Sequence, residues 1–83
     1  MTQTQQTQEK LERLVFDTLE SFGAEPAEIS REAGLKELDI DSLDMVELGQ
    51  IIEEEYGVRL TGADFKETRT VGEAIDVIAA RVL

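Results

Sequence analysis

Residues 37–48, ELDIDSLDMVEL, place one serine, Ser42, among acidic residues where a helical pattern begins. Asp and Ser are both favoured N-cap residues, so Asp41 or Ser42 can cap a helix that starts here. Apolar residues then recur until Tyr56, and Gly57 follows as a C-terminal stop. We therefore expect a helix from about Asp41 to Tyr56 with a hydroxyl in its first turn.

This expected helix has an apolar surface formed by Leu43, Val46, Leu48, Ile51, Ile52 and Tyr56. Gly49 lies in its middle, where glycine costs about 1 kcal/mol relative to alanine. Close packing against a neighbouring helix would explain this glycine, and so would extra room beside an internal cavity. We favour close packing.

Two further helices flank this segment. In residues 7–22, apolar side chains follow one helical face and end before Gly23; they are Leu11, Leu14, Val15, Leu19 and Phe22. A capping box, Thr70 to Glu73, starts the last helix. Its apolar residues are Val71, Ala74, Ile75, Ile78, Ala79 and Val82.

The remaining segments are connections. Residues 1–6 are polar and are expected to form a disordered tail. Residues 23–38 form a long loop, held to the core by Ile29, Leu35 and Leu38, with room for a short helical turn. Residues 61–66 can form one short helix around Phe65. The prediction is an all-α domain over residues 7–83, a small bundle of three main helices plus one short helix.

Composition narrows the function. The chain has 83 residues, a net charge of −11, and neither Cys nor His. No basic residue lies between Lys36 and Arg59. Nucleic acid is disfavoured as a partner because contacts with phosphate need clustered Lys and Arg side chains. No apolar run is long enough for membrane insertion. We expect a cytoplasmic protein whose natural counterparts are basic protein surfaces.

Catalysis by the side chains of this protein alone is disfavoured. Ser42 has no histidine to accept its proton, and a small bundle offers little room to separate the pKa values of two carboxylates. A calcium loop starting at Asp39 fails because Leu43, Asp44 and Gln50 occupy positions that need an oxygen ligand, glycine and glutamate. We therefore expect neither an enzyme nor a defined metal site.

Asp41-Ser42-Leu43-Asp44, then Val46-Glu47-Leu48 and Glu53-Glu54-Glu55-Tyr56-Gly57, resemble the attachment site and recognition helix of acyl carrier proteins. The resemblance extends over nearly the whole chain. It implies that Ser42 carries a 4′-phosphopantetheine arm derived from coenzyme A. This arm would bear acyl or polyketide chains as thioesters. The implied partners of this monomer are a phosphopantetheinyl transferase, acyltransferases, ketosynthases and other chain-modifying enzymes with basic patches.

The resemblance also implies roles for other residues. The docking residues would be Asp41, Leu43, Asp44, Met45, Glu47, Glu53, Glu54 and Glu55. Family members can shelter the acyl chain between their helices, and the candidates for lining such a cavity are Val46, Leu48, Ile52, Ile75 and Ile78; ordinary core packing explains each equally well.

Two departures and one alternative remain open. The family commonly has glycine at the position of Asp39, and related fatty-acid carriers tend to have an acid and an apolar residue in place of Lys66 and Thr68. Fatty-acid and polyketide assembly are both compatible with the sequence. The alternative function is an acidic interaction module or weak divalent-cation binder, in which Ser42 is a plain helix cap.

Overall fold

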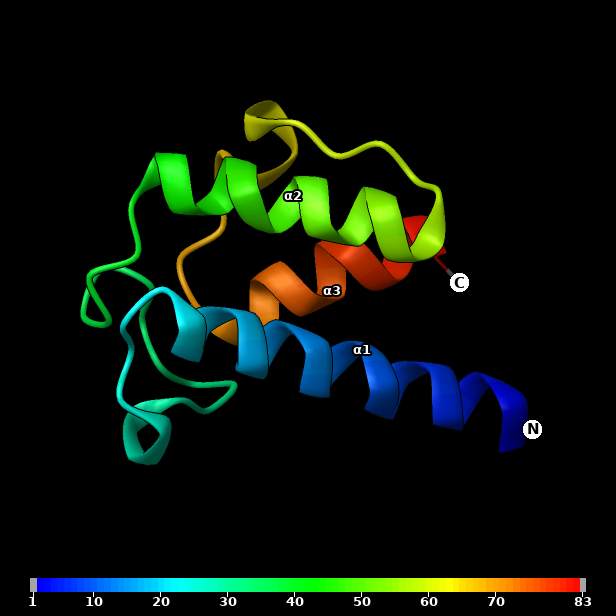
Figure 1. Ribbon diagram of the computed structural model, residues 1–83, viewed down its shortest axis with the longest axis horizontal. Helices are drawn as coiled ribbons and strands as arrows, with labels where there is room; N and C mark the ends of the chain where they lie inside the picture. Colours follow the sequence, from blue (N-terminus) through cyan, green and yellow to red (C-terminus); the bar gives the residue numbers. More distant parts are fainter. Residues whose placement is uncertain (1, 83) are drawn as a thin grey trace.

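The computed structural model describes residues 2–82, which form an all-α bundle. Three α-helices, α1 (Thr2–Ser21), α2 (Ser42–Tyr56) and α3 (Val71–Val82), are joined by connections that contain the 3₁₀ turns η1 (Pro26–Glu28) and η2 (Gly62–Phe65). Figure 1 shows α2 and α3 beginning at the same end of the bundle, while α1 runs back toward that end. The expected fold class is confirmed.

The first helix is longer than the sequence predicts. It begins at Thr2, whereas the apolar stripe predicts a start at Thr7 after a tail of residues 1–6. Gln is a good helix former, and a helix that has already nucleated gains one hydrogen bond for each residue added. Polar residues ahead of an apolar stripe can therefore extend a helix without contributing to the periodic pattern.

One continuous core joins the helices. Leu11, Val15 and Leu19 of α1 are fully buried, as are Leu48 and Ile52 of α2. Helix α3 adds Val71, Ile75 and Ile78, and α1 packs against it. Burial of a large aliphatic side chain contributes about 1.5–3 kcal/mol, so this apolar seam supplies most of the driving force for folding.

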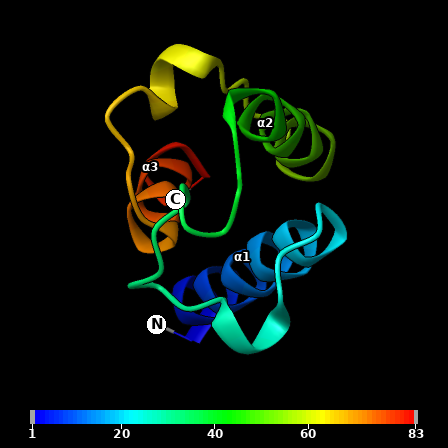
Figure 2. The same cartoon turned by 90° about the vertical axis from the view of Figure 1, so that its left-hand side faces the viewer.

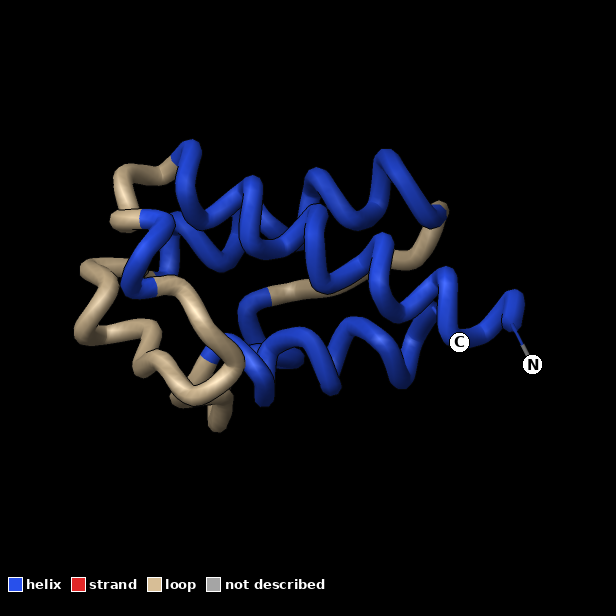
Figure 3. Tube along the Cα trace, turned by 90° about the horizontal axis from the view of Figure 1, so that it is seen from below, coloured by secondary structure: helices blue, strands red, loops and turns tan. Residues whose placement is uncertain are grey.

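The long connection between α1 and α2 is fixed by backbone pairing with the segment that leads into α3. The N–H of Leu35 donates to the carbonyl of Arg69 at 2.9 Å, and the N–H of Val71 donates to that of Ala33 at 3.0 Å. Gly72 then donates to the carbonyl of Arg31 at 2.8 Å. Leu35 and Leu38 are buried, as expected, so the connection is part of the bundle. Figure 3 shows this loop region gathered at one end of the helices.

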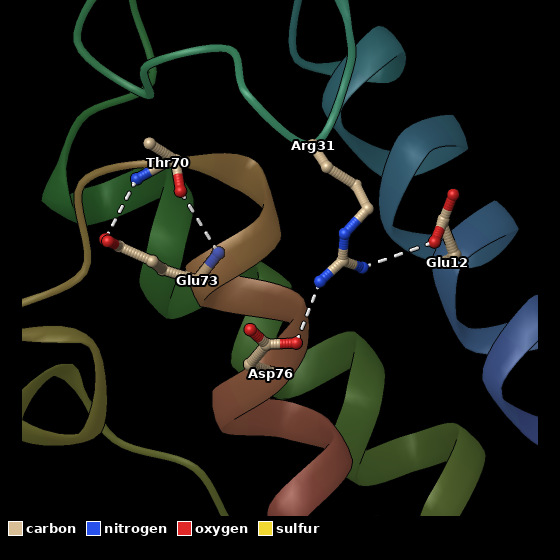
Figure 4. Close-up of polar contacts among 5 residues, drawn as sticks. All are labelled: Glu12, Arg31, Thr70, Glu73 and Asp76. Carbon is tan, nitrogen blue, oxygen red and sulfur yellow. Dashed lines mark hydrogen bonds and ion pairs between the residues drawn. The ribbon is translucent and has the colours of Figure 1, made fainter.

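The side chain of Arg31 also links the long connection to α1 and α3. Its guanidinium contacts Glu12 of α1 at 3.3 Å and Asp76 of α3 at 2.9 Å, as Figure 4 shows. The hydrogen bond with Asp76 raises the pKa of Arg31 above its ordinary value. In the same view, the Thr70 hydroxyl accepts from the N–H of Glu73 at 3.2 Å, which confirms the predicted capping box.

Gly49 packs closely against another segment. A Cβ atom built at this position would lie 3.1 Å from the carbonyl oxygen of Leu60, a tight contact. Close packing is therefore the correct explanation, although the neighbour is the connection after α2 and not a helix.

No helix in the described part of the chain is long and apolar enough to cross a bilayer.

Candidate functional site

The first turn of α2 is closed by two carboxylates. Asp41 is the N-cap, and its Oδ1 accepts a hydrogen bond from the N–H of Asp44 at 2.9 Å. In return, Oδ2 of Asp44 accepts from the N–H of Asp41 at 3.2 Å. This reciprocal capping box satisfies two backbone donors at the helix start and places acidic charge at the positive end of the helix dipole.

Ser42 is therefore the first residue of the helix and not its cap. The alternative in which Ser42 serves as a plain cap is wrong, because Asp41 performs that role. The Ser42 side chain is exposed, and its hydroxyl forms no hydrogen bond with another residue in the described range 2–82. The helix start thus presents an accessible hydroxyl that folding does not use.

The local backbone explains one departure from the expected pattern. Asp39, two residues before the Asp-Ser-Leu triplet, has a φ of 60°, the left-handed region that favours glycine. Asp tolerates this conformation better than most residues with a side chain. The chain therefore keeps the turn that a glycine would form here, so the loop geometry is retained.

The exposed face of α2 combines apolar and acidic side chains. Leu43 is 75% exposed and Val46 is 42% exposed, one helical turn apart, and Glu47 lies beside them. Glu53, Glu54 and Glu55 are exposed in the last turn, and none of the ion pairs among the described residues involves an acid of α2. The helix therefore presents an unneutralised acidic surface with two apolar side chains at its N-terminal half.

The exposures of Met45 and Val46 are the reverse of those expected from the sequence. Met45 is buried, at 7% exposed, and Val46 faces solvent. This arrangement reverses the sequence prediction, in which Met45 is a surface anchor and Val46 lines the cavity. The reason is helical spacing: Met45, Leu48 and Ile52 fall at i, i+3 and i+7, the spacing of one buried face, and Val46 falls beside it.

A pocket of about 880 Å³ opens beside Ser42. Its buried apolar wall comes from three segments: the connection before α2 supplies Leu35 and Ile40, α2 supplies Met45, and η2 supplies Phe65. Figure 2 looks onto this end of the bundle, where the segment entering α2, the η2 turn and the segment leading into α3 come together. An apolar chain attached at Ser42 would reach apolar surface immediately.

None of the expected cavity residues lines this pocket. Leu48, Ile52 and Ile78 are fully buried in the core, and Ile75 borders a separate cleft of about 780 Å³ between α1 and α3. The sequence reasoning did not connect Ile40 with the site. Its place just before the Asp41 cap, with buried Leu38 two residues earlier, is the signal that could have identified it.

Metal binding has no support from the geometry. Within residues 2–82, no group of three or more acidic or other metal-ligating side chains is arranged to hold an ion. The capping box also directs one carboxylate oxygen each of Asp41 and Asp44 toward backbone N–H groups. The acids of α2 are therefore arranged along a surface and do not converge.

Comparison with known proteins identifies the family. The family model described as "Phosphopantetheine attachment site" matches residues 13–78, which include Ser42. The chain is 40% identical over 79 residues to "Acyl carrier protein 2" of Ralstonia nicotianae, covering 94% of this chain and 93% of that one. It is 39% identical over 74 residues to the "Meromycolate extension acyl carrier protein" of Mycobacterium leprae and of Mycobacterium tuberculosis, covering 87% of this chain and 64% of each relative. The chain therefore belongs to the acyl carrier protein family, whose members are non-catalytic carriers with a phosphopantetheine attachment site.

Proposed function

We propose that Ser42 is the residue that bears the 4′-phosphopantetheine arm. The observation that carries this proposal is the exposed hydroxyl in the first turn of α2, which the Asp41–Asp44 capping box leaves without a structural task. When bound, the arm supplies the thiol that this chain, which lacks Cys, does not have. The unpaired N–H groups of a helix start also favour a negatively charged phosphodiester at this position.

Mass spectrometry tests this assignment directly. The protein is incubated with coenzyme A and a broad-specificity phosphopantetheinyl transferase, and the intact mass is measured. Addition of one arm is expected for the protein without substitutions and for Ser30→Ala. No addition is expected for Ser42→Ala. The chain has only three serines, so Ser21→Ala completes the control set. An arm that still attaches to Ser42→Ala would overturn the assignment.

The exposed face of α2 is proposed as the docking surface for the transferase and for synthase enzymes. Leu43 and Val46 serve as its apolar anchors, and Asp44, Glu47 and the acids at 53–55 supply charge that complements basic patches. Asp41 contributes charge at the edge of this surface. Such charges accelerate encounter and weaken in salt, which suits a carrier that must dock and leave repeatedly.

The pocket beside Ser42 is proposed as the shelter for the acyl chain, in fatty-acid or polyketide assembly. Its apolar wall of Leu35, Ile40, Met45 and Phe65 replaces the expected lining, none of which borders it. Each buried CH₂ group contributes about 0.8 kcal/mol. A cargo that binds only the folded state therefore raises the stability of the carrier.

A further inference from the structure

The pocket beside Ser42 has a charged rim as well as an apolar wall. Lys36, Lys66 and Arg69 all line it, which is three of the eight basic residues in a chain of net charge −11. All three are exposed. The ion pairs found among the described residues use Arg31 and Arg81, so none of these three cations forms an ion pair with a carboxylate of residues 2–82.

Three carboxylates share this pocket, and two of them accept hydrogen bonds from backbone N–H groups. Glu32, Glu37 and Asp41 also belong to its lining. Glu37 accepts a hydrogen bond from the N–H of Gly34 at 3.2 Å, and Asp41 accepts from the N–H of Asp44. These two acids keep their negative charge, so the lining holds three cations and three carboxylates, and the side-chain donors of the cations remain available for a ligand.

The cations come from two segments whose backbones pair with each other. Lys66 and Arg69 lie in the segment between η2 and α3, and Lys36 lies in the connection that pairs with it through Leu35 and Arg69. Figure 2 shows the segment between η2 and α3 on the opposite side of this end of the bundle from α2. Thr68, in the same segment, is half-buried in the lining. The lining to which Ser42 belongs therefore combines the apolar side chains of Ile40 and Met45 with cations from these two segments.

We propose that this pocket selects acyl chains that carry a carboxylate beyond the thioester, in preference to saturated chains of the same length. The proposal rests on Ser42 being the attachment residue. It predicts that a carboxylate on the acyl chain raises the stability of the loaded protein. Without the local cations, adding a negative charge to a strongly acidic protein should be unfavourable. The local cations reverse that expectation by pairing with the carboxylate while the methylene groups contact the apolar wall.

The test loads the protein with two matched acyl groups. The transferase is supplied with coenzyme A thioesters of a medium-length saturated acid and of the dicarboxylic acid of equal length, and intact mass confirms loading. Thermal unfolding is then compared at low salt. We expect the carboxylate-bearing form to unfold roughly 2–6 °C above the saturated form, with a smaller difference at high salt.

A pair of charge-matched variants identifies the cause. Lys66→Ala with Arg69→Ala should reverse the order of the two loaded forms, whereas Lys10→Ala with Arg59→Ala, which removes two exposed cations outside the lining, should preserve it. A saturated form that is the more stable in the unmodified sequence, or an order insensitive to Lys66 and Arg69, overturns the selectivity. Failure of loading overturns the Ser42 assignment instead, so the two failures are distinguishable.

Discussion

Asp41 and Asp44 exchange hydrogen bonds across the first turn of α2, each carboxylate accepting from the backbone N–H of the other residue. Ser42 stands between them with an exposed side chain. The two acids thus stabilise the helix start and remain exposed enough to contribute charge to a docking surface, and the hydroxyl between them is not needed for folding.

Removing the cap should cost more stability than removing the hydroxyl. Asp41→Ala is expected to lower the free energy of unfolding by about 0.5–2 kcal/mol, because it leaves the N–H of Asp44 without its partner. Ser42→Ala should change it by less than about 0.5 kcal/mol. Urea unfolding measures both, and Asp41→Asn, which keeps a capping oxygen, is the control. Equal losses for Asp41→Ala and Ser42→Ala would contradict the assigned cap.

The neighbouring residues Met45 and Val46 should respond in opposite ways. Met45→Ala is expected to lower the free energy of unfolding by about 2–4 kcal/mol, because it removes a buried side chain from the core. Val46→Ala should have little effect on stability and should instead raise the KM of the transferase for the protein. Unfolding curves and steady-state kinetics on both variants separate the two roles. A large stability loss at Val46 would show that it is a core residue.

Charge on α2 should control docking. Glu47→Lys is expected to raise the KM of the transferase by about three- to tenfold at low salt with little change in kcat, since encounter with a basic surface is weakened. Glu20→Lys, an exposed acid at the end of α1, is the matched control. Raising the salt concentration should narrow the gap between Glu47→Lys and the unmodified sequence. Equal effects at both positions would point to net charge and not to this surface.

The left-handed turn at Asp39 should accept glycine. Asp39→Gly is expected to raise the free energy of unfolding by about 0.5–1 kcal/mol, because glycine adopts a φ of 60° without Cβ strain. Asp39→Ala should lower it by a smaller amount, since alanine lacks the local hydrogen bonding that helps Asp tolerate this conformation. Denaturant titration gives the order glycine, aspartate, alanine. If alanine were as stable as glycine, backbone strain would not govern this position.

Acid should weaken the attachment of η2. The hydrogen bond from the N–H of Thr61 is the main cause that holds the pKa of Asp64 below its ordinary value of 3.8, and the Arg81 charge acts in the same direction. Because the folded-state pKa is depressed, this stabilisation is complete above the unfolded pKa and is lost as pH falls through the folded value. Asp64→Asn should flatten the stability profile below about pH 4. An unchanged acid slope would contradict the role of Asp64.

Local sequence patterns predicted the three helices, the Thr70–Glu73 capping box and the short turn at Phe65, whereas the reciprocal capping box of Asp41 and Asp44 was not predicted. They did not predict which side of α2 faces inward. Apolar residues surround much of that helix, so Leu43, Met45 and Val46 all fit an apolar face until Leu48 and Ile52 fix its direction. Nor did they predict which residues line the pocket, because its wall joins residues distant in the sequence, such as Ile40 and Phe65, through tertiary packing. The backbone pairing of the long connection follows no side-chain pattern and was equally invisible.

The direction of the helices has a practical consequence for handling the protein. Helix α1 begins and α3 ends at the side of the bundle opposite the start of α2, as Figures 1 and 3 show. An affinity handle, a fluorophore or a solid support joined ahead of α1 or after α3 would therefore leave the hydroxyl of Ser42 facing open solution. Immobilised protein should be modified as completely as free protein.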